Sequence, residues 1–392
     1  MREFENSVRL ILILILDGLS LCKLGGYLEI RNQGNDRSRL RRMRIGFLAP
    51  RYTLRGADVV LWAFAYFSDG VGSMGHESWV FVYDDDSDAD PNIHEPQNRE
   101  EAVRPFEHFK DKGRLIHVSG SGEPLECALR EHGIEVCYMY LAGFEDEKRL
   151  LPKGFPVVTH CIFNGMVELG DCHTVISTSV PHNPASGKTV VLPNILLIMN
   201  HDESFRKTFN IPEDAVVFGR YGGYMTFSIP WVKEAVMEFA KAHPEVWFVF
   251  MNTMPFSDMA EIRNILYVKG TSDLSLKRAF INTCDAMLHA RIDGETFGCA
   301  IGEFAVCGKP IITSPCIHRS FGYAADGHLD ILGGRACVYS DRQALTAWLS
   351  AFAEKQVHVD MKDNGYIEFV PDKVMPIFDR CVRLAKENFD SK

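Results

Sequence analysis

The sequence has no excess of basic residues. It contains 42 lysines and arginines against 52 aspartates and glutamates, which gives a formal net charge of −10. Because proteins that bind a nucleic-acid backbone normally present a basic face, this charge argues against a nucleic-acid partner. An acidic protein can still bind a diphosphate through local N–H groups and one or two arginines.

The sequence also lacks the cysteine patterns of metal and redox sites. Its 11 cysteines include no Cys-x-x-Cys pair and no Cys/His group with zinc spacing. Several lie in apolar segments, among them Cys137, Cys161 and Cys284, which predicts buried, reduced thiols in a cytoplasmic protein. The acidic run at residues 84–88 lacks the glycine and glutamate of a calcium-binding loop. We therefore expect this run to be solvated and the protein to bind no metal.

Residues 1–42 differ from the rest of the chain. The apolar run at residues 10–16 is far shorter than the about 20 residues that a membrane helix needs. The arginine-rich stretch 37–42 then leads directly to Met43 and a strand pattern. We expect the folded protein to start near Met43, with residues 1–42 a disordered leader or a translation-start artefact. A weak membrane anchor is the alternative.

From Met43 onward, short apolar runs rich in strand-forming residues alternate with helical patterns, as expected for doubly wound parallel sheets. The pattern divides into residues 43–200 and 201–392, with polar residues gathered before Pro212 and a helix expected at 374–388 near the end of the chain. No Gly-x-Gly-x-x-Gly follows the first strand at 45–48, which argues against a nicotinamide oxidoreductase. The fold class is α/β.

The most informative segment spans residues 294–310. Glu295 and Glu303 stand eight positions apart, around a small glycine-containing turn that opens into a short apolar helix. Strand patterns at 286–289 and 310–313 flank this unit. Free N–H groups at such a helix start suit a phosphate, and carboxylates accept hydrogen bonds from hydroxyls. A ligand with both groups is a nucleotide sugar.

This segment resembles the signature of retaining glycosyltransferases of the family 4 type (glycosyl transferases group 1), which have the GT-B fold. Their pattern reads roughly Glu-Gly-Phe-Gly, four residues, Glu, four residues, Gly. Here Thr296 replaces the first glycine, whereas Phe297, Gly298 and Gly308 fit the pattern. The sequence of residues 282–291 is similar to that of a distinct branch of uncharacterised transferases. The substrates of other family members therefore cannot be assigned to this chain by analogy. The alternative is an ordinary amphipathic helix with two solvated glutamates.

The resemblance implies two Rossmann-like domains that face a cleft, followed by a closing C-terminal helix. Residues 43–200 would form the acceptor domain and residues 201–392 the nucleotide-sugar domain. The implied activity moves a sugar from a nucleoside-diphosphate sugar to a carbohydrate or other hydroxyl acceptor. It would retain the anomeric configuration and use neither metal nor cofactor. A non-catalytic nucleotide-sugar-binding protein and a sugar-nucleotide epimerase of the same fold are the alternatives.

Within the second half, the resemblance implies that Glu295 holds hydroxyls of the donor sugar and Glu303 the ribose. N–H groups near Phe297, Gly298 and Cys299 would bind the diphosphate.

An arginine follows the first strand of this half in the run Phe-Gly-Arg-Tyr-Gly-Gly, and the resemblance assigns this Arg220 to the diphosphate. The family usually adds a lysine about five residues later, where this chain has Met-Thr-Phe at 225–227. The next lysine, Lys233, falls inside a helix pattern, so either the diphosphate site is weakened or another cation such as Arg291 substitutes. A surface ion pair is the alternative role of Arg220.

In the first half, His160 ends a strand pattern at the position where the family often carries a histidine near the reacting centre. The predicted catalytic set is therefore Glu295, His160 and Arg220, with a core histidine as the alternative for His160. Arg55 and Gly56, in the loop after the first strand, are expected to contact the donor. His289 is expected to be a hydrogen-bonded core residue.

Overall fold

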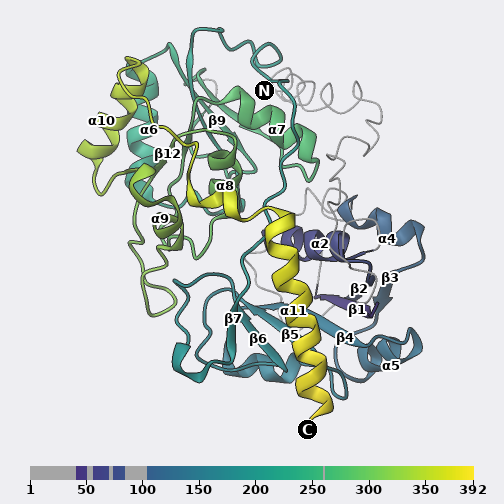
Figure 1. The fold of residues 1–392 in the computed structure, drawn as a ribbon. Helices are drawn as coiled ribbons and strands as arrows, with labels where there is room; N and C mark the ends of the chain where they lie inside the picture. The colour runs from purple at the N-terminus through teal and green to yellow at the C-terminus, as the bar shows by residue number, and fades with distance from the viewer. Residues whose placement is uncertain (1–40, 51–55, 70–73, 84–103, 259–260) are drawn as a thin grey trace.

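The computed structural model describes residues 41–50, 56–69, 74–83, 104–258 and 261–392 (Figure 1). Most of the leader, the acidic run at 84–88 and Arg55 lie outside the described residues. Gly56 is the first residue of helix α2. In the part of the chain that the structure describes, no helix combines the length and the apolar character needed to cross a membrane.

The first half is built on a sheet of seven parallel strands in the order β3-β2-β1-β4-β5-β6-β7. These strands read as near-continuous apolar runs because both faces of the sheet are covered. Helix α2 covers one face and α5 the other. The elements are β1 (Arg44–Ala49), α2 (Gly56–Ser68), β2 (Glu77–Tyr83), α4 (Glu107–Asp111), β3 (Leu115–Val118), α5 (Glu123–Glu131), β4 (Val136–Leu141), β5 (Val157–Cys161), β6 (Cys172–Val175) and β7 (Thr189–Val191).

The second half repeats this design with six parallel strands in the order β10-β9-β8-β11-β12-β13. Helices α6 and α10 pack on one face, and α7 and α8 on the other. The elements are β8 (Val216–Arg220), α6 (Pro230–Ala242), β9 (Val246–Met251), β10 (Ile265–Val268), α7 (Leu274–Thr283), β11 (Ala286–Leu288), α8 (Cys299–Val306), β12 (Ile311–Thr313), α9 (Gly327–Leu332), β13 (Ala336–Val338) and α10 (Arg342–Ala353).

The last helix, α11 (Pro371–Asp390), returns to the first half. Figure 1 shows it running in front of the first sheet, beside α2. Phe378 on its buried face lies 5.0 Å from the ring of Phe64 and 5.9 Å from that of Phe47. The C-terminal end of the chain therefore completes the core of the first half.

The two halves meet through connections that follow the carboxyl ends of strands in both sheets. The Ser177 hydroxyl, after β6, donates to the Thr296 carbonyl at 2.7 Å, and Ser179 donates to Asp330 at 2.6 Å. The rings of Phe163, after β5, and Phe321, after β12, stack at 3.9 Å. These contacts bring the carboxyl ends of the two sheets together.

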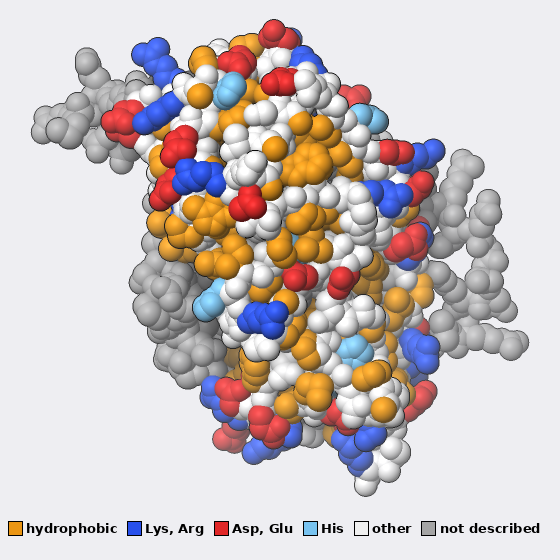
Figure 2. Space-filling view, turned by 90° about the vertical axis from the view of Figure 1, so that its left-hand side faces the viewer, with side chains coloured by type: hydrophobic (Ala, Val, Ile, Leu, Met, Phe, Trp, Pro, Cys, Tyr) orange, Lys and Arg blue, Asp and Glu red, His pale blue; other side chains and the backbone are white. Residues whose placement is uncertain are grey.

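The distribution of surface charge and the burial of the cysteines match what the sequence predicts. On the face shown in Figure 2, lysines and arginines are interspersed with acidic side chains and form no single basic patch. The ten described cysteines are free, and Cys137, Cys161 and Cys284 are buried, as predicted. Burial raises the pKa of each of these three thiols, to about 12 in the case of Cys161.

Candidate functional site

The strand order of the second sheet places the candidate site. From β8 the chain builds outward through β9 and β10, and then returns to the other side of β8 as β11. Ligands of open parallel sheets bind outside the carboxyl ends of strands at such a reversal. Arg220 is the last residue of β8, and His289, Arg291 and Glu295 follow β11. The tertiary fold therefore brings these four residues to one point.

Glu295 is held in place by a tight turn. Gly294 has a φ of +68°, and a Cβ at this position would lie 2.2 Å from the Ala325 carbonyl oxygen, so only glycine fits. The Glu295 N–H then donates to the same carbonyl at 2.7 Å. This bond fixes the backbone that carries the first carboxylate of the pair.

The Glu295 carboxylate lies between a cation and a histidine. Arg291 Nη1 donates to Oε2 at 2.9 Å, and His289 Nε2 lies 3.6 Å from Oε1. Burial raises the pKa of Glu295, but the charge of Arg291 is the main influence that outweighs burial and holds this pKa well below its usual range. Glu295 is therefore an ionised hydrogen-bond acceptor at neutral pH, which suits a sugar hydroxyl.

Arg220 is buried and bonded to its own neighbourhood. Its Nη1 donates to Thr253 Oγ1 at 2.5 Å, and its Nη2 donates to the Gly223 carbonyl at 2.9 Å and to the Thr226 hydroxyl. Burial lowers the pKa of Arg220 to about 9, against the opposing effect of Glu295, so it remains a cation at neutral pH. Thr226, in the segment where the family carries its lysine, supplies no charge and instead anchors Arg220.

In the part of the chain that the structure describes, the backbone N–H groups at the start of α8 have no hydrogen-bond partner. Its N-cap, Gly298, is left-handed with a φ of +79° and provides no side-chain cap. The first helical bond runs from the Gly302 N–H to the Gly298 carbonyl at 2.9 Å, so the N–H groups of residues 299–301 have no partner within the helix. The Cys299 thiol accepts from Asn194 Nδ2 at 3.2 Å, and burial raises the pKa of this thiol to about 12.

Phe297 supports this turn from inside the protein. Its ring is buried, and its carbonyl accepts a hydrogen bond from the Tyr366 hydroxyl. The rings of Phe297 and Tyr366 pack edge to face at 5.6 Å. The side chain of Phe297 thus positions the backbone of the turn.

Glu303 lies on the buried face of α8, where Tyr221 donates a hydrogen bond to its Oε2. Lys277 Nζ lies 3.9 Å from Oε1 and 5.8 Å from the centre of the Tyr221 ring. Each glutamate of the pair therefore has a cation beside it, Arg291 for Glu295 and Lys277 for Glu303. Lys277 and Tyr221 were not predicted as site residues from the sequence, because neither lies within the 294–310 segment.

His160 lies in the core of the first half. It is buried within β5, its Nδ1 is 2.7 Å from the Tyr138 hydroxyl, and its ring packs against those of Phe64 and Tyr140. Burial lowers the pKa of His160 to about 3. Within the described residues these contacts all belong to the first half, so the catalytic role of His160 stays a prediction.

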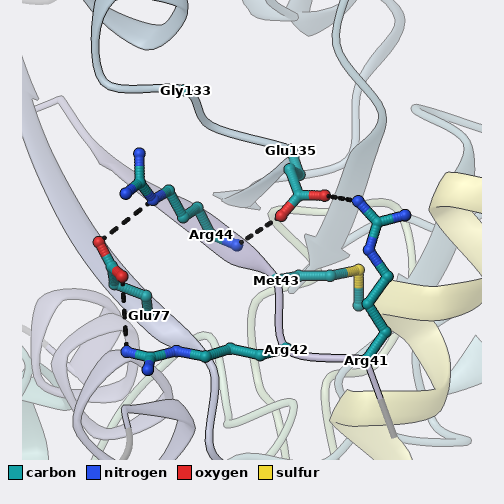
Figure 3. A pocket seen from close by; sticks show the side chains of 7 residues that line it. All are labelled: Arg41, Arg42, Met43, Arg44, Glu77, Gly133 and Glu135. Carbon is teal, nitrogen blue, oxygen red and sulfur yellow. Dashed lines mark hydrogen bonds and ion pairs between the residues drawn. The ribbon is translucent and has the colours of Figure 1, made fainter.

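A hollow of about 360 Å³ lies at the other end of the first sheet, beside the amino ends of β1 and β2 (Figure 3). Its three arginines are compensated by two glutamates: Arg41 pairs with Glu135, and Arg42 and Arg44 pair with Glu77. Each of these arginines is therefore already in an ion pair with a carboxylate of the hollow. Among the described residues, no group of three or more His, Cys, Asp or Glu side chains is arranged to hold a metal ion.

The sequence matches no family model and no curated protein. Solved structures with the same architecture do match. Anabaena Alr3699/HepE in complex with UDP-glucose has a TM-score of 0.56 at 13% identity, over 86% of this chain and 99% of that chain. The pneumococcal O-GlcNAc transferase GtfA in complex with UDP and GlcNAc has a TM-score of 0.56 at 9% identity, over 88% and 99%.

A third similar structure is the UDP-GlcNAc 2-epimerase from Neisseria meningitidis bound to UDP-GlcNAc. Its TM-score is 0.52 at 12% identity, over 87% of this chain and 100% of that chain. At these identities the likeness shows the fold alone. The chain has the GT-B fold, with two Rossmann-like domains, as the sequence predicted.

Proposed function

We propose that this protein transfers a sugar from a nucleoside-diphosphate sugar to a hydroxyl acceptor. The observation that carries the proposal is the ionised Glu295 carboxylate, which lies beside Arg291 at the reversal of strand order and next to the free N–H groups of α8. Sugar hydroxyls need an acceptor such as this carboxylate, and a diphosphate needs the donors. Structures of similar fold hold UDP-glucose, UDP with GlcNAc, and UDP-GlcNAc, which favours UDP as the nucleotide.

The charge that develops on the departing diphosphate is the main barrier to such a transfer. We assign its stabilisation to Arg220, Arg291 and the N–H groups of residues 299–301, because fixed donors and cations in a water-poor site commonly supply several kcal/mol. Protein cations in this role make a metal unnecessary, so we propose a metal-independent reaction. Glu303, bonded to Tyr221 and beside Lys277, would hold the ribose.

We also propose that the anomeric configuration is retained. Glu295 is engaged by Arg291 through one of its two oxygens, so it is better placed to hold the sugar than to attack it. The acceptor would then enter on the face from which the diphosphate leaves, and a phosphate oxygen would take its proton. The anomer of the product, read by proton NMR, tests this: inversion would contradict the proposed course.

One observation favours a second function, the binding of a nucleotide sugar without turnover. Thr226 provides no cation, and Arg220 is bonded to its own loop. If Arg220 cannot turn to the diphosphate, the donor would bind without being activated. A nucleotide sugar that binds but is neither hydrolysed nor transferred to any acceptor would support this alternative.

The first experiment measures thermal stabilisation of the full chain by UDP-, GDP- and ADP-sugars, with and without EDTA. A ligand that binds the native state raises its melting temperature. We expect stabilisation by one nucleotide class, unchanged by EDTA. The matched control replaces Glu131, an exposed glutamate of α5, with glutamine. Stabilisation should persist in Glu131→Gln and decline in Glu303→Gln, and no stabilisation by any nucleotide would refute the proposal.

A further inference from the structure

His289 carries a buried nitrogen that no protein group satisfies. The residue is 5% exposed, and its Nδ1 lies 2.8 Å from the Thr313 hydroxyl oxygen. Its Nε2 is buried and has no hydrogen-bond partner among the described residues. Glu295 Oε1 is 3.6 Å away, which is too far for a hydrogen bond. Buried polar groups are nearly always paired, so this orphan needs an explanation.

The hydrogen bonds around Thr313 determine which nitrogen of His289 carries the proton. His328 Nε2 lies 3.2 Å from the Ser314 carbonyl and Nδ1 lies 3.4 Å from the Glu295 carbonyl, and both carbonyls can only accept. We assign the hydrogen of this neutral ring to Nε2, which makes the shorter contact. The same nitrogen lies 3.1 Å from the Thr313 hydroxyl oxygen and donates to it as well. The Thr313 hydroxyl is then left to donate to His289 Nδ1. We therefore assign the hydrogen of a neutral His289 to Nε2, on the side of Glu295.

Charge and burial agree with this assignment. Burial lowers the pKa of His289, against the opposing effect of Glu295, so the ring is neutral at neutral pH. Arg291 occupies Glu295 Oε2, while within the described part of the chain Oε1 accepts no hydrogen bond. A donor, His289 Nε2–H, and an acceptor, Glu295 Oε1, thus lie side by side without bonding each other.

We propose that His289 Nε2–H and Glu295 Oε1 together bind one hydroxyl of the donor sugar. A hydroxyl oxygen about 2.8 Å from both atoms would bridge their 3.6 Å separation, accepting from His289 and donating to Glu295. The inference rests on the proposed function and adds a specificity to it. The pair requires a group that both donates and accepts, so it should reject a deoxy sugar and also a fluoro sugar, which cannot donate.

Two substitutions of His289 separate this role from a structural one. The amide of glutamine reaches about as far as Nε2, so His289→Gln keeps an N–H near Glu295. The shorter asparagine reaches about as far as Nδ1, so His289→Asn keeps a partner for Thr313 but loses that N–H. Both variants lack the imidazole ring and its packing contacts. A purely structural histidine would not distinguish them in ligand binding.

The experiment compares UDP-glucose with UDP by isothermal titration calorimetry on the full chain. We expect the wild type to bind UDP-glucose more tightly than UDP. This preference should fall about tenfold in His289→Asn, as for one lost hydrogen bond, and survive in His289→Gln. Affinity for UDP itself should be the same in all three proteins. In the wild type, both the deoxy and the deoxyfluoro analogue at one sugar position should also lose about tenfold.

The control is His173→Gln. His173 is a buried histidine of the first half whose nitrogens contact the Gly165 carbonyl at 3.1 Å and the Leu169 N–H at 3.3 Å. This variant should lose stability without changing the preference for UDP-glucose. Equal preferences in His289→Asn and His289→Gln, or a wild type that binds UDP and UDP-glucose equally, would overturn the inference alone. If UDP does not bind at all, the proposed nucleotide is wrong, and the inference, which depends on it, is wrong as well.

Discussion

Replacing His160 with asparagine should make the protein less sensitive to acid. The imidazole is fully buried in the first sheet, and its Nδ1 is 2.7 Å from the Tyr138 hydroxyl. Asparagine can still accept from that hydroxyl but does not titrate. The variant therefore removes the protonation of His160 while keeping the polar contact.

The size of the effect follows from the pKa of His160, which burial lowers from 6.5 to about 3. Between these two pH values the unfolded chain binds a proton that the native protein does not. The titration of His160 therefore leaves the free energy of unfolding unchanged above about pH 6.5 and lowers it steadily as the pH falls from 6.5 towards 3. From pH 6.5 to pH 4, the loss at this one site amounts to about 3 kcal/mol.

Differential scanning calorimetry between pH 7.5 and pH 4 measures this difference. At neutral pH the variant should melt below the wild type, because the smaller side chain leaves a cavity. As the pH falls to 4, the melting temperature of the wild type should fall by roughly 6–12 °C more than that of the variant, given roughly 2–4 °C per kcal/mol for a domain of this size. The difference between the two proteins should therefore narrow or change sign. The pKa of His328, which burial lowers to about 4, affects both proteins equally and cancels.

If the melting temperatures of the two proteins change by the same amount with pH, this reasoning is refuted, because His160 then has the same pKa in the native and unfolded states. The same variant also tests the predicted catalytic role of His160. A loss of turnover at pH 7.5 beyond what the lower melting temperature explains would support that role.

Three further predictions concern the second half. Glu303→Ala should destabilise the protein by about 3 kcal/mol in urea unfolding, because it leaves the buried Lys277 without its carboxylate. The same variant should bind the nucleotide more weakly, and an unchanged affinity would contradict the assignment of Glu303 to the ribose. Arg291→Met should make UDP-sugar affinity fall between pH 7.5 and pH 5, because it removes the main influence that opposes burial, and the pKa of Glu295 then rises. A pH-independent affinity in calorimetry would contradict this. Gly302→Ala should destabilise the protein by about 1–3 kcal/mol, because its Cβ would lie 2.6 Å from the Tyr366 ring and 2.7 Å from Leu196; Gly334→Ala, at an open position, is the control and should have little effect.

Much of the architecture could be predicted from local patterns. Strands β11 and β12 lie within the predicted strand patterns 286–289 and 310–313 and differ from them by one residue each, because each is a short apolar run bounded by polar or turn residues. Two elements escaped prediction. Helix α9 has six residues and strand β13 has three, which is too short for a hydrophobic period to show. Their structure depends on packing against the rest of the second half.

The sequence by itself determined the local unit at residues 294–310, because one turn and one helix fix how Glu295 and the N–H groups of α8 are presented. Tertiary structure alone decided which side chains meet that unit. Tyr221 reaches Glu303 across 82 positions, and Thr226 anchors Arg220 in place of a second cation. Likewise, only the packing of β11 against β12 places Thr313 beside His289 and leaves His289 Nε2 facing Glu295. Spacing along the chain predicts contacts within one turn of a helix or strand, whereas contacts between distant segments depend on how the sheets and helices pack.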